Sequence, residues 1–208
     1  MTRVDARQLW LVQLRLECKA LDETGERIIR IAGPDPDEIP TCSVARFTDG
    51  FTVTFDSSVD QGVVEKAATV APELFFEDSA SVAEHLGGQR KLKVSKCSTY
   101  AFPELVAPPG PTIVRKEHER FGIFADGCEL SGASSARTNS EAAELWVWTE
   151  PDARRRGYAE QVSRAWAAEV TGEGRVAFYS HEEDNDPSRR LAATLGVVHL
   201  FDLVQLTF

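Results

Sequence analysis

One stretch, residues 144–159, constrains the fold more than any other part of the chain; its sequence is ELWVWTEPDARRRGYA. The run from Glu144 to Thr149 is rich in Trp and Val, which suit a pleated strand, and Pro151 ends it. Beyond the turn, apolar residues recur at the spacing of one helical face, at Ala159, Val162, Trp166 and Val170. The stretch therefore predicts a strand, a tight polar turn and the start of a helix that runs to about Val170.

The turn and the first helical positions carry features of a phosphate-binding site. The first N–H groups of a helix have no internal partner, and the helix dipole adds positive charge there. Gly157 lets a ligand approach the backbone without meeting a Cβ. The predicted phosphate contacts are Arg154, Arg155, Arg156, Gly157, Tyr158 and Ala159. An arginine cluster is also common on solvated surfaces, so the motif needs support from its context.

That context is a second pattern in the same half of the chain. Arg175 to Ser180 predicts another strand, and residues 185–196 follow N-x-x-S-x-x-L-A-x-x-L-G. Together the two patterns resemble the signatures of the GNAT superfamily of N-acetyltransferases, over roughly residues 110–208. The first signature is an apolar strand, a Pro-containing turn and Q/R-x-x-G-x-G/A. The second is a strand, N-x-x-A/S and a helix that ends in Gly.

The resemblance implies an α+β fold with a mixed, mostly antiparallel sheet and flanking helices. In such a sheet two parallel strands, here 142–149 and 175–180, splay apart around coenzyme A. Acetyl-CoA would be the acyl donor and a small-molecule amine the acceptor. The pyrophosphate would lie on the turn, and the pantetheine arm along Val147, Trp148 and Thr149, pairing with exposed backbone groups. Asn185 and Ser188 would line the other wall, although both also suit an ordinary helix N-cap.

Two positions where the family often carries proton-transfer groups hold alanine in this chain, Ala143 in place of a Glu and Ala192 in place of a Tyr. Glu144 is adjacent to the first position and could serve as base if the strand bulges. His181 follows the strand 175–180, and histidine suits acid–base work near neutrality. Glu144 and His181 are therefore the predicted catalytic residues. The alternatives are a solvent-facing Glu and a solvated loop His.

The Pro- and Gly-rich run 107–111 predicts a linker. It divides the chain into an N-terminal α+β half, 1–106, and the acetyltransferase-like half, 107–208. In the first half we expect helices at 5–21, 60–71 and 80–87, and strands at 27–31, 43–47, 51–55 and 91–102. In the second half we expect antiparallel strands at 121–125, 129–137 and 142–149, and a last strand at 199–208 that closes the sheet. The N-terminal half would contribute to the acceptor pocket, because domain junctions are common ligand sites.

Composition narrows the classes of function. The net charge of −10 argues against non-specific binding to nucleic acid or to an anionic membrane, because both need a positive surface. No apolar run approaches the length of a membrane span, and the N-terminus lacks the apolar core of a signal peptide. The four cysteines share no metal-like spacing, so we predict no metal and expect a reduced, cytoplasmic protein.

Two classes of function therefore stay open. One is an N-acetyltransferase that uses acetyl-CoA. The other is a non-catalytic acyl-CoA-binding or sensing protein, which the alanines at 143 and 192 favour. The oligomeric state also stays open between monomer and homodimer.

Overall fold

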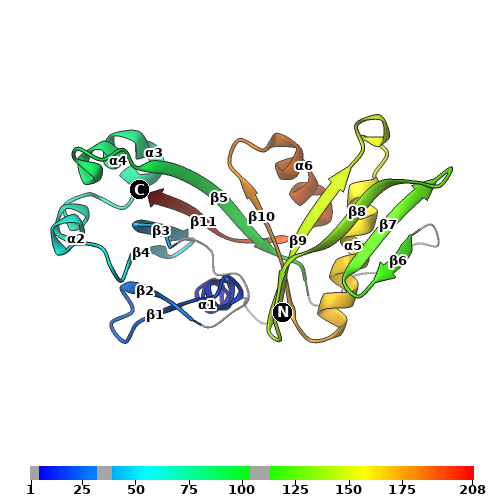
Figure 1. The fold of residues 1–208 in the computed structure, drawn as a ribbon, viewed down its shortest axis with the longest axis horizontal. Helices are drawn as coiled ribbons and strands as arrows, with labels where there is room; N and C mark the ends of the chain where they lie inside the picture. Colours follow the sequence, from blue (N-terminus) through cyan, green and yellow to red (C-terminus); the bar gives the residue numbers. More distant parts are fainter. Residues whose placement is uncertain (1–4, 32–38, 104–112) are drawn as a thin grey trace. The chain divides into compact units, whose positions relative to one another are not determined.

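A computed structural model describes residues 5–31, 39–103 and 113–208 of the chain (Figure 1). The chain forms two compact units, residues 1–98 with 200–208 and residues 99–199. The predicted linker 107–111 lies outside the described residues. No helix in the described part combines the length and the apolar character that a membrane span needs.

The first unit is an α+β unit. Its strands follow the order β1-β2-β4-β3-β11, with β2 and β4 parallel and the β3–β4 and β3–β11 pairs antiparallel. Its elements are α1 Ala6–Leu16, β1 Lys19–Leu21, β2 Arg27–Arg30, β3 Cys42–Phe47, β4 Gly50–Asp56, α2 Gln61–Ala68, α3 Leu74–Glu77 and α4 Ser79–Gly87. β5 (Lys93–Ala101) leads out of this unit and β11 (Val198–Thr207) leads back into it.

The sequence predicted most of this unit, with one correction at its start. Asp5 caps α1 through its side chain, and the hairpin β3–β4 has the expected turn. The helix ends at Leu16 rather than at Leu21. Cys18 adopts a positive φ of 58°, which reverses the chain, and Lys19–Leu21 pairs with β2 as a strand.

The last strand is a second correction. We expected residues 199–208 to close the sheet of the C-terminal half as its last strand, but β11 lies between β3 and β5 in the strand order and pairs with β3 from Asp202↔Arg46 to Leu206↔Cys42. Val204 and Leu206 are fully buried in the core of the first unit. Alternation along a strand shows which face is apolar, but it does not show which strands lie alongside. The position of this strand in the sheet was therefore predicted wrongly.

The second unit contains the candidate site. Its strands follow the order β5-β10-β9-β8-β7-β6, in which β9 and β10 are parallel and β6 to β9 are successively antiparallel. The remaining elements are β6 Val114–Glu117, β7 Arg120–Ala125, β8 Cys128–Thr138, β9 Ala142–Thr149, the 3-10 turn Pro151–Ala153, α5 Tyr158–Gly172, β10 Val176–Glu182 and α6 Asp186–Leu195. The predicted α+β fold with a mixed sheet is confirmed.

Helix α5 holds this unit together. It packs along β7, β8 and β9 (Figure 1), and its apolar face supplies Val162, Trp166 and Val170, all fully buried. The Trp166 indole N–H also donates to Ser135 Oγ at 2.9 Å, so the buried ring keeps a polar partner. Because this helix is fixed against β9, its N-terminus is fixed near the end of that strand.

Candidate functional site

The parallel strands β9 and β10 separate along their length. Their ladder joins Ala142 to Val176, Ala143 to Ala177 and Glu144 to Phe178, and it goes no further. From Leu145 to Thr149, β9 continues to pair with β8 on its other side. In the described part of the chain, the edge of β9 that faces β10 therefore carries backbone groups without a strand partner over Leu145–Thr149, as the resemblance implied.

The predicted pantetheine contacts Val147, Trp148 and Thr149 lie on this unpaired edge, and all three are partly buried. Ser131 on β8 supports them from the other side, because its hydroxyl donates to the Trp148 carbonyl at 2.8 Å and lies 2.9 Å from Thr149 Oγ1. The strand is thus held in place by β8 while its opposite edge stays open to a ligand.

The turn after β9 has an unusual backbone. Arg155 adopts a φ of 61° and Gly157 a φ of 76°, both in the left-handed region that residues other than glycine seldom adopt. Gly157 is the N-cap of α5, and no side chain caps that helix. A Cβ at Gly157 would meet only Gln161 Nε2, at 3.9 Å. The first turn of α5 is therefore free to accept an anion.

The three arginines of the turn are exposed, but they differ in what they contact. Arg154 Nε donates to the Thr149 carbonyl at 3.4 Å, and Arg156 Nη2 donates to the Asp152 carbonyl at 3.2 Å. Both bonds stabilise the turn itself. The Arg155 side chain makes no hydrogen bond or ion pair within the described residues, so its charge is the most available to a phosphate.

Asn185 and Ser188 have a structural role that the sequence had offered as the alternative. Asn185 is the N-cap of α6, and its Oδ1 accepts from the Ser188 N–H at 3.1 Å. The Ser188 carbonyl accepts from the Tyr179 hydroxyl at 3.4 Å. Burial is the largest effect on Tyr179 and raises the pKa of its phenol. Tyr179 is thus a neutral donor that is occupied in joining β10 to α6.

Glu144 is buried and already paired. Arg137 Nη1 lies 2.6 Å from Glu144 Oε2. A bulge is present beside it, but the register shift lies in β8, between Ser135 and Arg137, so it does not re-aim β9. The neighbouring Ala143 and the Ala192 of α6 are core residues, 0% and 4% exposed. At the two positions where the family often carries proton-transfer groups, this chain therefore has only buried alanine side chains.

His181 is not the solvated loop residue that the sequence left as its alternative. It lies within β10 and is 6% exposed. Its Nδ1 lies 2.9 Å from the Glu182 carbonyl oxygen, whereas its buried Nε2 has no hydrogen-bond partner among the described residues. Tyr100 on β5 stacks on the ring with centroids 5.5 Å apart. Sequence reasoning missed Tyr100, because no motif marks a residue that meets the site only through sheet order.

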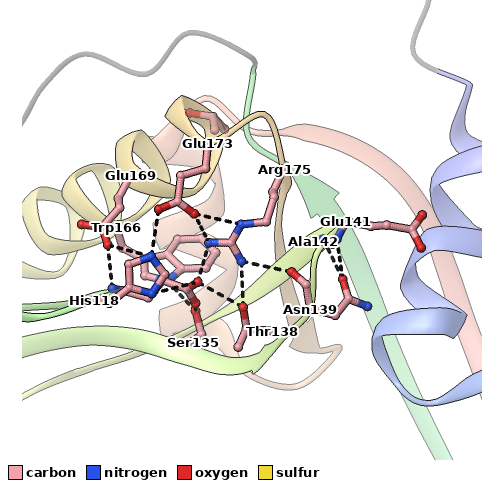
Figure 2. A network of polar contacts seen from close by, with 12 residues as sticks. His118, Ser135, Thr138, Asn139, Glu141, Ala142, Trp166, Glu169, Glu173 and Arg175 are labelled. Carbon is pink, nitrogen blue, oxygen red and sulfur yellow. Dashed lines mark hydrogen bonds and ion pairs between the residues drawn. The ribbon is translucent and has the colours of Figure 1, made fainter. Parts of the chain in front are cut away.

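A second polar cluster, also missed, joins the β6–β7 turn to the end of α5 and the start of β10 (Figure 2). Buried Glu119 accepts from Ser135, Thr138 and Arg175, and His118 Nε2 lies 2.8 Å from Glu173. Possible metal-ligating atoms of His118, Glu119 and Glu173 come within 4.8 Å of one another. Arg175 bonds to both carboxylates, so a positive charge already occupies the cluster.

Known proteins that resemble the chain belong to one family model and to several solved structures. Residues 114–203 match the model of the family described as FR47-like protein. No curated protein matches the chain. A GNAT-family protein from Novosphingobium aromaticivorans is 20% identical over 56% of this chain and 66% of that one, slightly less than two thirds of its length, with a TM-score of 0.48.

Two further solved structures match along nearly the whole chain. A GCN5-related N-acetyltransferase from Kribbella flavida is 13% identical over 99% of this chain and 96% of that one, with a TM-score of 0.49. A GNAT-family acetyltransferase from Colwellia psychrerythraea is 15% identical over 98% of this chain and 96% of that one, with a TM-score of 0.50. The chain therefore has the fold of the GNAT-superfamily N-acetyltransferases, and residues 114–203 match the model of the FR47-like family.

Proposed function

We propose that the protein is an N-acetyltransferase that transfers the acetyl group of acetyl-CoA to an amine of a small molecule. The observation that carries this proposal is the end of the β9–β10 ladder at Glu144 and Phe178, which is followed along the chain by the uncapped N-terminus of α5. An open strand edge and an anion-binding turn in this order suit a ligand with amide groups at one end and phosphates at the other.

The residues present fit such a ligand. The N–H groups of Gly157, Tyr158 and Ala159 at the start of α5 and the Arg155 guanidinium would hold the phosphates. Arg154 and Arg156 would keep the turn in shape. Glu160 lies in the first helical turn, but Arg164 neutralises it at 3.0 Å. Val147, Trp148 and Thr149 would orient the amide-bearing arm. Asn185 and Ser188 would act mainly by fixing α6.

The acyl group arrives activated as a thioester, so the protein needs to position the amine and accept its proton. The new carbon–nitrogen bond replaces the carbon–sulfur bond, the sulfur keeps the bonding electrons, and the amine proton must be accepted by a base. Glu144 and His181 remain the proposed catalytic residues. His181 is the better prepared of the two, because its Nε2 is unpartnered, whereas Arg137 holds the Glu144 carboxylate.

The alternative is an acyl-CoA-binding or sensing protein that does not transfer the acyl group. The apolar core positions of Ala143 and Ala192 favour it, because proton-transfer groups of the family are missing there. All four cysteines are free, which suits the cytoplasmic location that we propose for either function.

Thiol release from acetyl-CoA in the presence of a panel of small amines tests the proposal. Amine-dependent release of free CoA, together with mass-spectrometric detection of the N-acetylated amine, supports the enzyme. Tight CoA binding by calorimetry without turnover of any amine supports the sensor. Absence of CoA binding would overturn both.

A further inference from the structure

Three aromatic rings, those of Tyr100, Tyr179 and His199, form a cluster with His181 in the second unit. Tyr100 stacks on the imidazole with the ring planes 26° apart, and Tyr179 lies tilted against it with centroids 6.3 Å apart. Tyr100 also meets His199 edge to face, at 5.2 Å between centroids. These rings come from β5, β10 and β11, so sheet order alone brings them together. The titratable side chains that contact His181 directly are Tyr100 and Tyr179, and His199 contacts Tyr100.

The contacts of the His181 imidazole determine which of its two ring nitrogens carries the proton. The Glu182 carbonyl oxygen can only accept, so His181 Nδ1, 2.9 Å away, carries the proton and donates it. In the neutral ring Nε2 then holds a lone pair. That nitrogen is buried and has no hydrogen-bond partner in the part of the chain that the structure describes, although buried polar atoms are nearly always hydrogen-bonded. The Tyr179 hydroxyl is not available to it, because it donates to Ser188.

We propose that Tyr100 is a positioning residue that holds the His181 imidazole so that the lone pair of Nε2 is kept for the amine of the acceptor. The stacked ring of Tyr100 keeps the imidazole from rotating away from the Glu182 carbonyl, and this fixes the tautomer. The amine gives its proton to Nε2 as the carbon–nitrogen bond forms, the carbon–sulfur bond breaks with its electrons staying on the sulfur, and the imidazolium then releases the proton to water. This inference rests on the proposed function.

The phenol ring of Tyr100, rather than its hydroxyl, carries the proposed role, since the described residues include no hydrogen-bond partner for that hydroxyl. Tyr100→Phe should therefore keep the stacking, and Tyr100→Ala should remove it. In Tyr100→Leu the leucine side chain fills much of the same volume without a planar ring. This variant replaces Tyr100→Ala in the experiments if the alanine variant does not fold.

Nitrogen NMR of protein with ¹⁵N-labelled histidine tests the positioning without any turnover, with His181→Gln identifying the signals. Wild type and Tyr100→Phe should both show one tautomer with Nδ1 protonated, and Tyr100→Ala or Tyr100→Leu should show exchange between tautomers. A wild-type ring protonated at Nε2, or one fixed tautomer in the leucine variant, would overturn the inference.

Kinetics with one good amine supply the second measurement. Tyr100→Leu should lower kcat by about 10²-fold, the low end of the range for lost acid–base catalysis. The affinity for CoA measured by calorimetry should stay unchanged, and Tyr100→Phe should keep the wild-type kcat. If the wild type acetylates no amine, the proposed function fails, and the nitrogen spectra still decide whether Tyr100 positions His181. Equal kcat in wild type and Tyr100→Leu would overturn the proposed role in catalysis.

Discussion

Glu144 is the last residue of β9 that pairs with β10, and Phe178 is its partner. Beyond this pair the two parallel strands no longer share a ladder, while β9 remains fixed to β8 as far as Thr149. The position of the opening is thus set by where one short ladder stops. The proposed base His181 lies three residues beyond Phe178 along β10, past the point of separation.

The state of His181 leads to a prediction about the pH–rate profile. We expect His181→Gln to lower kcat/KM for the amine on the order of 10²-fold, because glutamine cannot take up the proton. The acidic limb of the profile should disappear, whereas the affinity for CoA should not change. An acidic limb that is the same in wild type and variant would exclude His181 as the base.

Glu144→Gln should cost less activity than His181→Gln. The Glu144 carboxylate is already paired with Arg137 at 2.6 Å, so it would have to leave this partner to accept a proton. Initial rates with the same amine, measured beside those of the His181 variant, check the order. A larger loss in the Glu144 variant, with unchanged thermal stability, would make Glu144 the base.

The buried ion pair of Arg175 and Glu119 predicts a stability effect. Both side chains are at least nine-tenths buried, so Arg175→Met would leave a carboxylate without its charged partner and should cost about 3–5 kcal/mol of unfolding free energy. The double variant Arg175→Met with Glu119→Gln should recover part of the loss. Urea unfolding of the single and the double variant measures these free energies. Equal stability of the two variants would show that the unpaired Glu119 carboxylate is not the cause of the loss.

His118 predicts a dependence of stability on pH. Its hydrogen bond with Glu173 is the largest cause that raises the pKa of His118 above the ordinary 6.5. A raised folded-state pKa means that the stabilisation is complete below about pH 6.5 and is lost as the pH rises through the folded value. The melting temperature of His118→Gln should therefore lie below that of wild type at pH 6, and the two should converge at pH 9. A constant difference would contradict this account.

The sequence predicted the elements that depend on local pattern. The Asp5 cap, the β3–β4 hairpin, and the strand–turn–helix of 144–159 all carry short-range signals, and the structure has each of them. β6 was missed because all four of its residues are exposed, which leaves no apolar alternation to find. α3 was missed because it has only four residues.

Features that depend on strand neighbours could not be predicted in the same way. No short-range pattern predicts that β11 pairs with β3 or that Tyr100 stacks on His181, because these contacts join residues far apart in the chain. The positive φ of Arg155 was also hidden, since arginine does not signal a left-handed backbone. The turn itself could be predicted because proline, glycine and arginine are recognisable there, and its phosphate contacts stay a prediction.

The affinity of the chain for CoA, measured by calorimetry for a matched pair of glycine variants, tests the central claim most directly. Gly157 and Gly174 have nearly equal φ values, 76° and 77°, so Gly157→Ala and Gly174→Ala should strain the backbone alike. Gly174 lies just after α5, at the opposite end from the turn. The account predicts that Gly157→Ala weakens CoA binding at least about 10-fold, or about 1.4 kcal/mol, whereas Gly174→Ala binds as wild type does. Equal affinities in the two variants would contradict the placement of the phosphates at the start of α5.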